Sequence, residues 1–253
     1  MKEHMNFIQR VTKIPKKWEL ALWWVFRIMM IIGIFLPLWK DKLPFLSFSK
    51  EIPFAQNVLQ MGANTLAMFL WEIFMMFPKK SFLRQIPTYI QDVSVPFIFC
   101  TAFCGAYLSF YYSIWWWDSF LHTLGGLLGV ICGYEFLCAM QKRDKTYCNL
   151  PIMLFAAFGF CFVFGNLWEL FEFTYDQIAL GDSQHWSIEL AQEGYRTLFP
   201  SRDPGRFALM DTMGDMVCNT VGSVVGYIFL KIFPYHHKGK HDLNALYPQK
   251  DGD

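Results

Sequence analysis

The chain has 253 residues, of which 54% are hydrophobic, 19% aromatic and only 17% charged. Soluble domains usually carry about 25% charged residues, so this composition argues against a soluble protein. The formal net charge is only +1, and the lysines and arginines gather beside apolar runs, where anionic lipid headgroups attract them. We therefore expect membrane lipids, and no nucleic acid, as partners.

Apolar runs of about 20 residues are long enough to cross a bilayer as helices. The first run is too long for a signal peptide and lacks a small-residue cleavage site, so we expect it to be retained as an anchor. We predict an all-α fold, a polytopic membrane bundle of about six helices within residues 18–233. The six runs cover residues 18–39, 54–77, 89–112, 116–140, 150–175 and 208–233.

The basic residues indicate an orientation. They concentrate in the N-terminal segment 1–17, in the second and fourth connections and in the tail 234–253. Because Lys and Arg favour the cytoplasmic side, we expect both termini in the cytoplasm and the bundle in the cytoplasmic membrane. Residues 176–207 then form an outer loop. Its stretch SIELAQEGYRTLF lies between GDSQHW and PSRDPG and predicts an amphipathic helix that lies over the bundle as a lid.

The fourth run carries a polar stripe that continues into small residues. Asp118 and His122 are four residues apart and therefore share one helix face. The face continues through Gly125, Gly129 and Gly133. Glycines at this spacing let another helix approach closely, so we predict a helix-packing surface here.

The sixth run has the same design. Asp211, Asp215 and Asn219 recur every four residues, and Gly222 and Gly226 follow them. At 1.5 Å per residue, Asp211 to Asn219 covers about 12 Å of helix. Asp215 and Asn219 are therefore expected within the hydrocarbon depth, and the two glycines are predicted packing positions.

The fifth run ends in FGNLWELFEFTYD, which carries Asn166, Glu169, Glu172 and Asp176 at spacings of three and four. A carboxylate in hydrocarbon costs roughly 2.5–3.5 kcal/mol at a helix centre. In the predicted orientation the fourth run begins, the fifth ends and the sixth begins at the outer surface. The three polar stripes therefore reach the same depth. We expect them to face one another, because their polar side chains then have one another as partners.

Three arrangements would compensate the negative charge of this many carboxylates. A divalent cation is one: oxygen ligands suit Mg, Ca or Mn, and carboxylates with a His also suit Zn or Fe. Protonation is the second, with the acids relaying protons or coupling ions. The third is a structural network in which Arg196, Arg202 or Arg206 of the outer loop pairs with the acids.

We favour the cation. In this hypothesis the ion acts as a Lewis acid and generates a nucleophile from water. Its predicted ligands are Asp118, His122, Glu169, Asp211 and Asp215, of which all but Asp211 are also the predicted catalytic residues. The residues expected to support these ligands are Asn166, Glu172, Asn219 and Arg206.

One stretch of the sixth run resembles a known signature. GRFALMDTMGDMVCNTVGSVVGY is similar to the C-terminal signature of VanZ-like teicoplanin-resistance membrane proteins, in which an Arg precedes a D-x-x-x-N-x-x-G helix. Those positions are here Arg206, Asp215, Asn219 and Gly222. Together with WDSFLHTLGG and NLWELFEF, the sequence resembles the uncharacterised YjdF-type bacterial membrane proteins. The resemblance implies a multispan membrane protein of the bacterial cell envelope and supplies no established chemistry.

The leading functional hypothesis is a membrane hydrolase or transferase that acts on a lipid or lipid-linked substrate. An ion- or proton-coupled transporter that uses the same acids is the first alternative. A non-catalytic membrane scaffold, whose acids pair with loop arginines, is the second.

Overall fold

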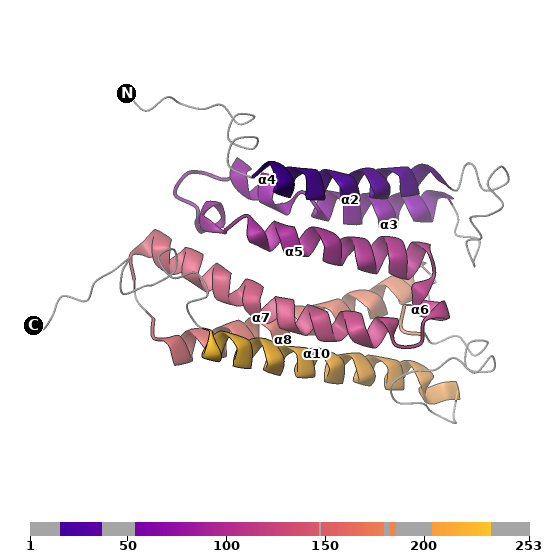
Figure 1. Cartoon of the computed structure of the whole chain (residues 1–253). Coiled ribbons are helices and arrows are strands. Elements are labelled where there is room, and N and C mark those ends of the chain that lie inside the picture. Colours follow the sequence, from indigo (N-terminus) through magenta and orange to yellow (C-terminus); the bar gives the residue numbers. More distant parts are fainter. Residues whose placement is uncertain (1–15, 37–53, 147, 180–182, 186–203, 234–253) are drawn as a thin grey trace, which may run out of the picture. The chain divides into compact units, whose positions relative to one another are not determined.

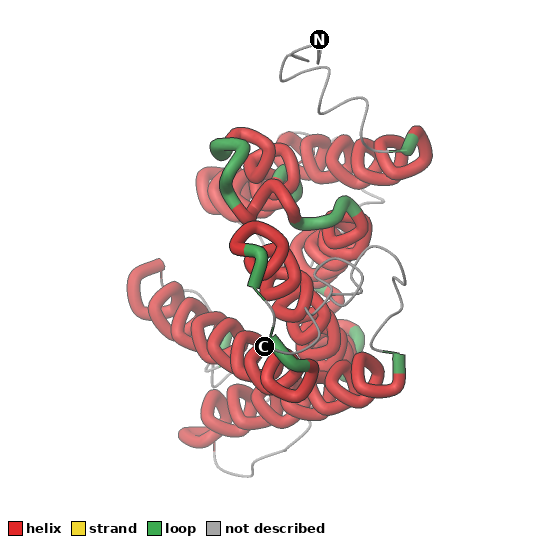
Figure 2. Tube along the Cα trace, turned by 90° about the vertical axis from the view of Figure 1, so that its left-hand side faces the viewer, coloured by secondary structure: helices red, strands yellow, loops and turns green. Residues whose placement is uncertain are grey.

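A computed structural model describes residues 16–36, 54–146, 148–179, 183–185 and 204–233. Within these ranges the regular structure is helical (Figure 2), which confirms the predicted all-α class. The predicted amphipathic helix of the outer loop, the tail and the N-terminal segment up to residue 15 lie outside the described residues. The chain divides into two compact units, one up to Ser113 and one from Ile114.

The first unit is built from apolar helices of very different lengths. Its second apolar run does not form one continuous helix, because α3 stops at Ala67 and α4 begins at Leu70. Its third run continues from α5 into a π-helix, η3, which begins three residues after Pro96. Pro96 has no N–H and so removes one helical hydrogen bond. The elements are α2 (Lys17–Phe35), α3 (Phe54–Ala67), α4 (Leu70–Met76), η2 (Phe82–Gln85), α5 (Tyr89–Ile98), η3 (Phe99–Tyr107) and α6 (Phe110–Ser113).

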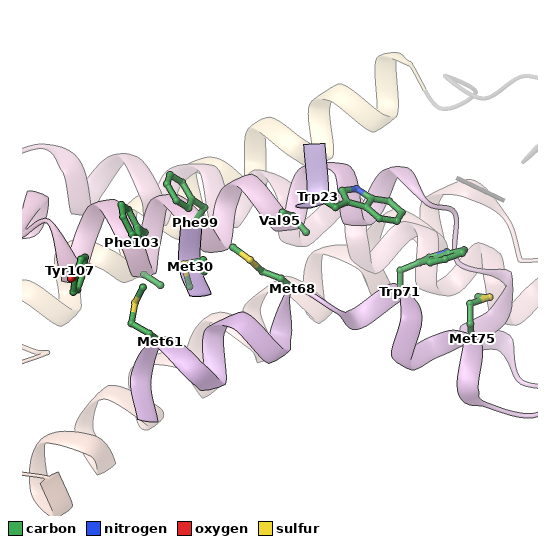
Figure 3. Close-up of a cluster of buried hydrophobic side chains, with 11 residues drawn as sticks. Trp23, Met30, Met61, Met68, Trp71, Met75, Val95, Phe99, Phe103 and Tyr107 are labelled. Atoms are coloured by element: carbon green, nitrogen blue, oxygen red, sulfur yellow. The ribbon is translucent and has the colours of Figure 1, made fainter. Parts of the chain in front are cut away.

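Methionine and aromatic side chains form the core of the first unit (Figure 3). The rings of Trp23 and Trp71 lie 5.7 Å apart, and those of Phe99 and Phe103 stack at 4.8 Å. Met61 and Met68 belong to the same cluster as the aromatic groups, and their unbranched side chains adapt to irregular gaps.

A buried arginine ties the break between α3 and α4 to α2. Arg27 is 0% exposed, and its Nη1 lies 2.8 Å from Oε1 of Glu72. Its Nη2 donates to the carbonyl of Met68 at 2.8 Å, at the point where the helix is interrupted. Gln91 on α5 donates to Glu72 and accepts the N–H of Trp71. The carbonyl of Met68 and the N–H of Trp71 at the break therefore have side-chain partners, and the guanidinium of Arg27 is paired with the Glu72 carboxylate.

The second unit contains three long helices (Figure 1). They are α7 (Trp117–Asp144), α8 (Leu150–Ala179) and α10 (Phe207–Ile232), with the short η4 (Pro204–Arg206) before α10. The end of α7 is fixed locally, because Lys145 adopts a left-handed conformation with φ 53°. Gln141 then accepts the N–H of Cys148 at 2.9 Å and so stabilises the tight connection to α8.

Glycines let α7 and α10 approach backbone to backbone. A Cβ added at Gly222 would collide with the carbonyl oxygen of Thr123, and one at Gly226 would lie 2.9 Å from that of Leu127. These contacts advance together along both helices, so α7 and α10 run in the same direction. Close approach of this kind is what small residues provide in membrane bundles.

Contacts of α8 run in the opposite sense. A Cβ at Gly129 would lie 2.6 Å from Sγ of Cys161, and one at Gly133 would lie 3.0 Å from the carbonyl of Ala157. Higher numbers on α7 thus meet lower numbers on α8, which makes the two helices antiparallel. The α7 and α10 helices therefore begin at the end of the unit where α8 finishes, which we call the acid end.

Four helices among the described residues are long and apolar enough to cross a membrane: α2, α7, α8 and α10. They correspond to the first, fourth, fifth and sixth predicted runs. The third run appears as a shorter apolar helix, Tyr89–Gly105, and the second is interrupted. The structure thus supports several membrane helices, while the count of six and the orientation remain predictions.

Replacing Gly222 by alanine should destabilise the second unit, because the new Cβ meets a backbone oxygen that cannot rotate away. Overpacking of this kind costs about 1–3 kcal/mol, so we expect a lower melting temperature in detergent. Gly159→Ala is the matched control, since a Cβ there has no neighbour within 4 Å. Equal melting temperatures for the two variants would contradict the packing described for α7 and α10.

Replacing Arg27 by methionine should destabilise the first unit by up to about 3–5 kcal/mol, because it leaves the partly buried Glu72 carboxylate without its cationic partner. Thermal unfolding in detergent measures this loss, and adding Glu72→Gln should recover part of it. The control is Lys80→Met, at an exposed position. If Arg27→Met melted like the control, the buried ion pair would not hold this unit together.

Candidate metal centre

The register of the three helices brings their Asp and Glu side chains to the same height along the helix axes. A Cβ at Gly165 on α8 would collide with the side chain of Asn219 on α10. One turn further toward the acid end, the antiparallel register places Glu169 beside Asp215. The parallel register of α7 and α10 likewise brings His122 to Asp215, within 3.6 Å.

His122 lies between two carboxylates. Its Nε2 is 3.5 Å from Oδ1 of Asp118 and 3.6 Å from Oδ2 of Asp215. Hydrogen bonds between nitrogen and oxygen normally span about 2.7–3.2 Å, so both separations are long for direct bonds. The three ligand atoms nevertheless lie within 4.8 Å of one another.

These separations suit a cation between the three side chains. With metal–ligand bonds of about 2.0–2.2 Å, neighbouring ligands of a tetrahedral ion are about 3.3–3.6 Å apart. The two distances from Nε2 of His122 fall in or at this interval. Asp118, His122 and Asp215 therefore form a set that an ion can fill with little movement.

A second group shares Asp215 with the first. Ligand atoms of Glu169, Glu172 and Asp215 also lie within 4.8 Å of one another. Glu169 is only 8% exposed, and its Oε2 has no hydrogen-bond partner among the described residues. A buried carboxylate oxygen without a partner is costly. We call Asp118, His122, Glu169, Glu172 and Asp215 the acid cluster.

The helix dipoles act unequally on the acid cluster. Asp118 lies in the first turn of α7, where the partial positive charge of a helix N-terminus favours an anion. Glu172 lies nearly two turns before the end of α8 at Ala179, too far from either terminus for the helix dipole to act on it. Among the described residues, the ion pairs recorded for the acid cluster involve His122 and no Lys or Arg.

Asp211 has a different partner from the one expected. Its Oδ2 lies 3.0 Å from Nδ1 of His185, and both side chains are buried. Asp211 belongs to neither of the two groups. His185 was not a candidate from sequence, because it lies in a connection, has no spacing to another ligand and reaches Asp211 only through the fold.

Asp176 holds the segment that carries His185. Its Oδ1 accepts the N–H of Ser183 at 2.8 Å and its Oδ2 accepts that of Gln184 at 2.9 Å. The side chain of Gln184 then donates to Thr212 on α10 at 3.0 Å. This carboxylate therefore anchors a turn at the acid end and lies apart from the two groups.

The supporting residues predicted from sequence take different positions. Asn166 is exposed on α8, and Arg206 is exposed at the start of α10. Glu172 accepts a hydrogen bond from Nε1 of Trp168 at 2.9 Å. Asn219 lies where the three helices meet, within 3.6 Å of Sγ of Cys161. Arg196 and Arg202 lie outside the described residues.

A small polar junction closes the site on its deeper side. Sγ of Cys161 lies 3.3 Å from the carbonyl of Gly126 and 3.2 Å from Oγ of Ser223. Ser223 in turn donates to the carbonyl of Asn219 at 2.7 Å. These groups satisfy one another and join α7, α8 and α10 about one turn below Asp215.

Comparison with known proteins gives a family and no activity. Residues 45–236 match the family described as Predicted membrane protein (DUF2238). An uncharacterized protein from Thermotoga maritima is 30% identical over 95 residues, which are 38% of this chain and 48% of that protein. The chain thus matches about half the length of this relative. No solved structure matches.

These matches support the expectation of a membrane protein family without established chemistry, and they carry neither the YjdF-type nor the VanZ-like name. The family match extends from before α3 to the end of α10 and includes the whole acid cluster. The chain therefore belongs to the family of predicted membrane proteins described as DUF2238.

Proposed function

We propose that the protein is a cation-dependent membrane hydrolase or transferase that acts on a lipid or lipid-linked substrate. The observation that carries this proposal is the placement of Nε2 of His122 at 3.5 and 3.6 Å from the carboxylates of Asp118 and Asp215. Those separations are longer than normal hydrogen-bond lengths. They match the distances between neighbouring ligand atoms around a tetrahedral metal ion.

The ligand set leaves room for chemistry. Three protein ligands leave at least one coordination position open, which is the arrangement of catalytic rather than structural sites. A divalent cation supplies Lewis acidity there and activates a bound water. One imidazole with carboxylates suits Zn, Fe or Mn, and a site richer in oxygen also accepts Mg or Ca.

The surroundings of Glu172 support a substrate that arrives from the bilayer. Trp168, which donates to this carboxylate, is 46% exposed. Leu167 and Phe171 are more than half exposed on the same helix. The edge of the acid cluster therefore borders an apolar surface, along which acyl chains pack while a polar headgroup reaches the carboxylates.

A carrier remains the second candidate, because the opposite half of α7 holds the buried Glu135. A proton or ion pathway uses acids at several depths, and Glu135 together with the acid cluster would provide two. Flux in proteoliposomes that depends on both Glu135 and Asp215 would favour the carrier over the enzyme.

Metal binding tests the proposal directly. Purified protein in detergent should retain a divalent cation after desalting, as measured by elemental analysis. Asp215→Asn should weaken binding by about two orders of magnitude or more, because it removes a charged ligand that both groups share. Affinity should also fall with falling pH, because protons compete for the carboxylates and the imidazole.

The control for this experiment is Asp144→Asn, at an exposed position at the other end of α7. It should bind the cation as the unchanged protein does, and thermal unfolding should show that both variants remain folded. A folded protein that retains no divalent cation, or an Asp215→Asn variant that binds like the control, would refute the proposal.

A further inference from the structure

We infer that the acid cluster holds two divalent cations bridged by Asp215. This inference rests on the proposed cation-dependent function and specifies its centre. Asp118 and His122 complete the ligands of one ion, and Glu169 and Glu172 complete those of the other. Asp215 is common to both groups, as a carboxylate with one oxygen for each ion would be.

The distances between the ligand atoms argue against a single ion. Ligands of one ion with bonds of about 2.2 Å are at most about 4.4 Å apart. The ligand atoms of the acid cluster do not form one set within 4.8 Å but divide into two groups of three. An ion held by Asp118, His122 and Asp215 therefore leaves the glutamates of α8 outside its coordination sphere.

The second group has its own evidence of a ligand. Oε2 of Glu169 is buried and has no hydrogen-bond partner among the described residues, and Glu169 is more than nine-tenths buried. Its carboxylate contributes to the group with Glu172 and Asp215. An ion in that group gives the Glu169 carboxylate a partner, which an ion in the first group does not.

The charge of the acid cluster also indicates two ions. The acid cluster contains four carboxylates, and the nearby Asp211 already pairs with His185. One divalent cation would leave two carboxylates uncompensated among apolar helices, where unpaired charge is expensive. Two divalent cations balance all four while His122 binds as a neutral imidazole. Two-metal centres stabilise both the attacking and the leaving oxygen of a displacement, which agrees with a hydrolase or transferase.

Manganese is a suitable probe, because its electron paramagnetic resonance spectrum distinguishes isolated from coupled ions. The full chain in detergent, loaded with Mn²⁺ and desalted, should contain two ions per chain with a coupled spectrum. His122→Ala and Glu169→Gln should each reduce the content to one ion and give the spectrum of an isolated ion. Asp215→Asn should abolish the coupled spectrum and weaken both sites.

Each alternative outcome decides between the two proposals. One ion per chain in the unchanged protein, with an isolated-ion spectrum, would overturn the dinuclear centre and leave the cation-dependent function in place. No bound ion would overturn both. If a variant failed to fold, the stoichiometry and spectrum of the unchanged protein would still decide. Two uncoupled ions, or a Glu169→Gln variant that kept both, would also refute the bridge.

Discussion

The close approach of α7 and α10 through Gly222 and Gly226 is the contact on which the site depends. Each glycine lies against a backbone oxygen of α7, so the two helices have a fixed register as well as a short separation. That register sets His122 beside Asp215. The opposed register of α8, fixed at Gly129 and Gly133, brings the glutamates to the same level. The polar residues therefore meet because the residues deeper in the bundle are small.

The same packing brings several carboxylates close together among apolar helices. Close helices exclude water, and apolar surroundings weaken dielectric screening, so carboxylates within a few ångströms strongly repel one another. The His185 and Asp211 pair shows one local solution, in which an imidazole and a carboxylate satisfy each other at 3.0 Å. The acid cluster has one imidazole for four carboxylates, and Oε2 of Glu169 remains without a partner among the described residues. The cation that we propose for this cluster would supply the positive charge that these side chains lack.

Much of the second unit could be predicted from sequence. Spacings of four placed Asp118 with His122 and Asp211 with Asp215 on single helix faces, and the long apolar runs gave the helices that carry them. Spacing alone could not tell which member of a stripe meets a neighbour. Asp211, expected as a ligand, is hydrogen-bonded to His185. His185 belongs to a connection with no periodic pattern, which contacts α10. Asn166 lies three residues before Glu169 but is exposed, since Asn166 and Glu172 lie on opposite sides of Glu169 around the helix.

The first unit was harder to predict, because its interruptions arise from long-range partners. The break after Ala67 has no Gly or Pro to announce it, and it depends on Arg27 of α2 binding the carbonyl of Met68.

X-ray absorption at the edge of bound zinc tests the central claim about the second unit most directly. The account predicts a shell of nitrogen and oxygen at about 2.0–2.2 Å with an imidazole contribution that His122→Ala removes. A shell of water oxygens alone, or an imidazole signal that survives His122→Ala, would contradict it.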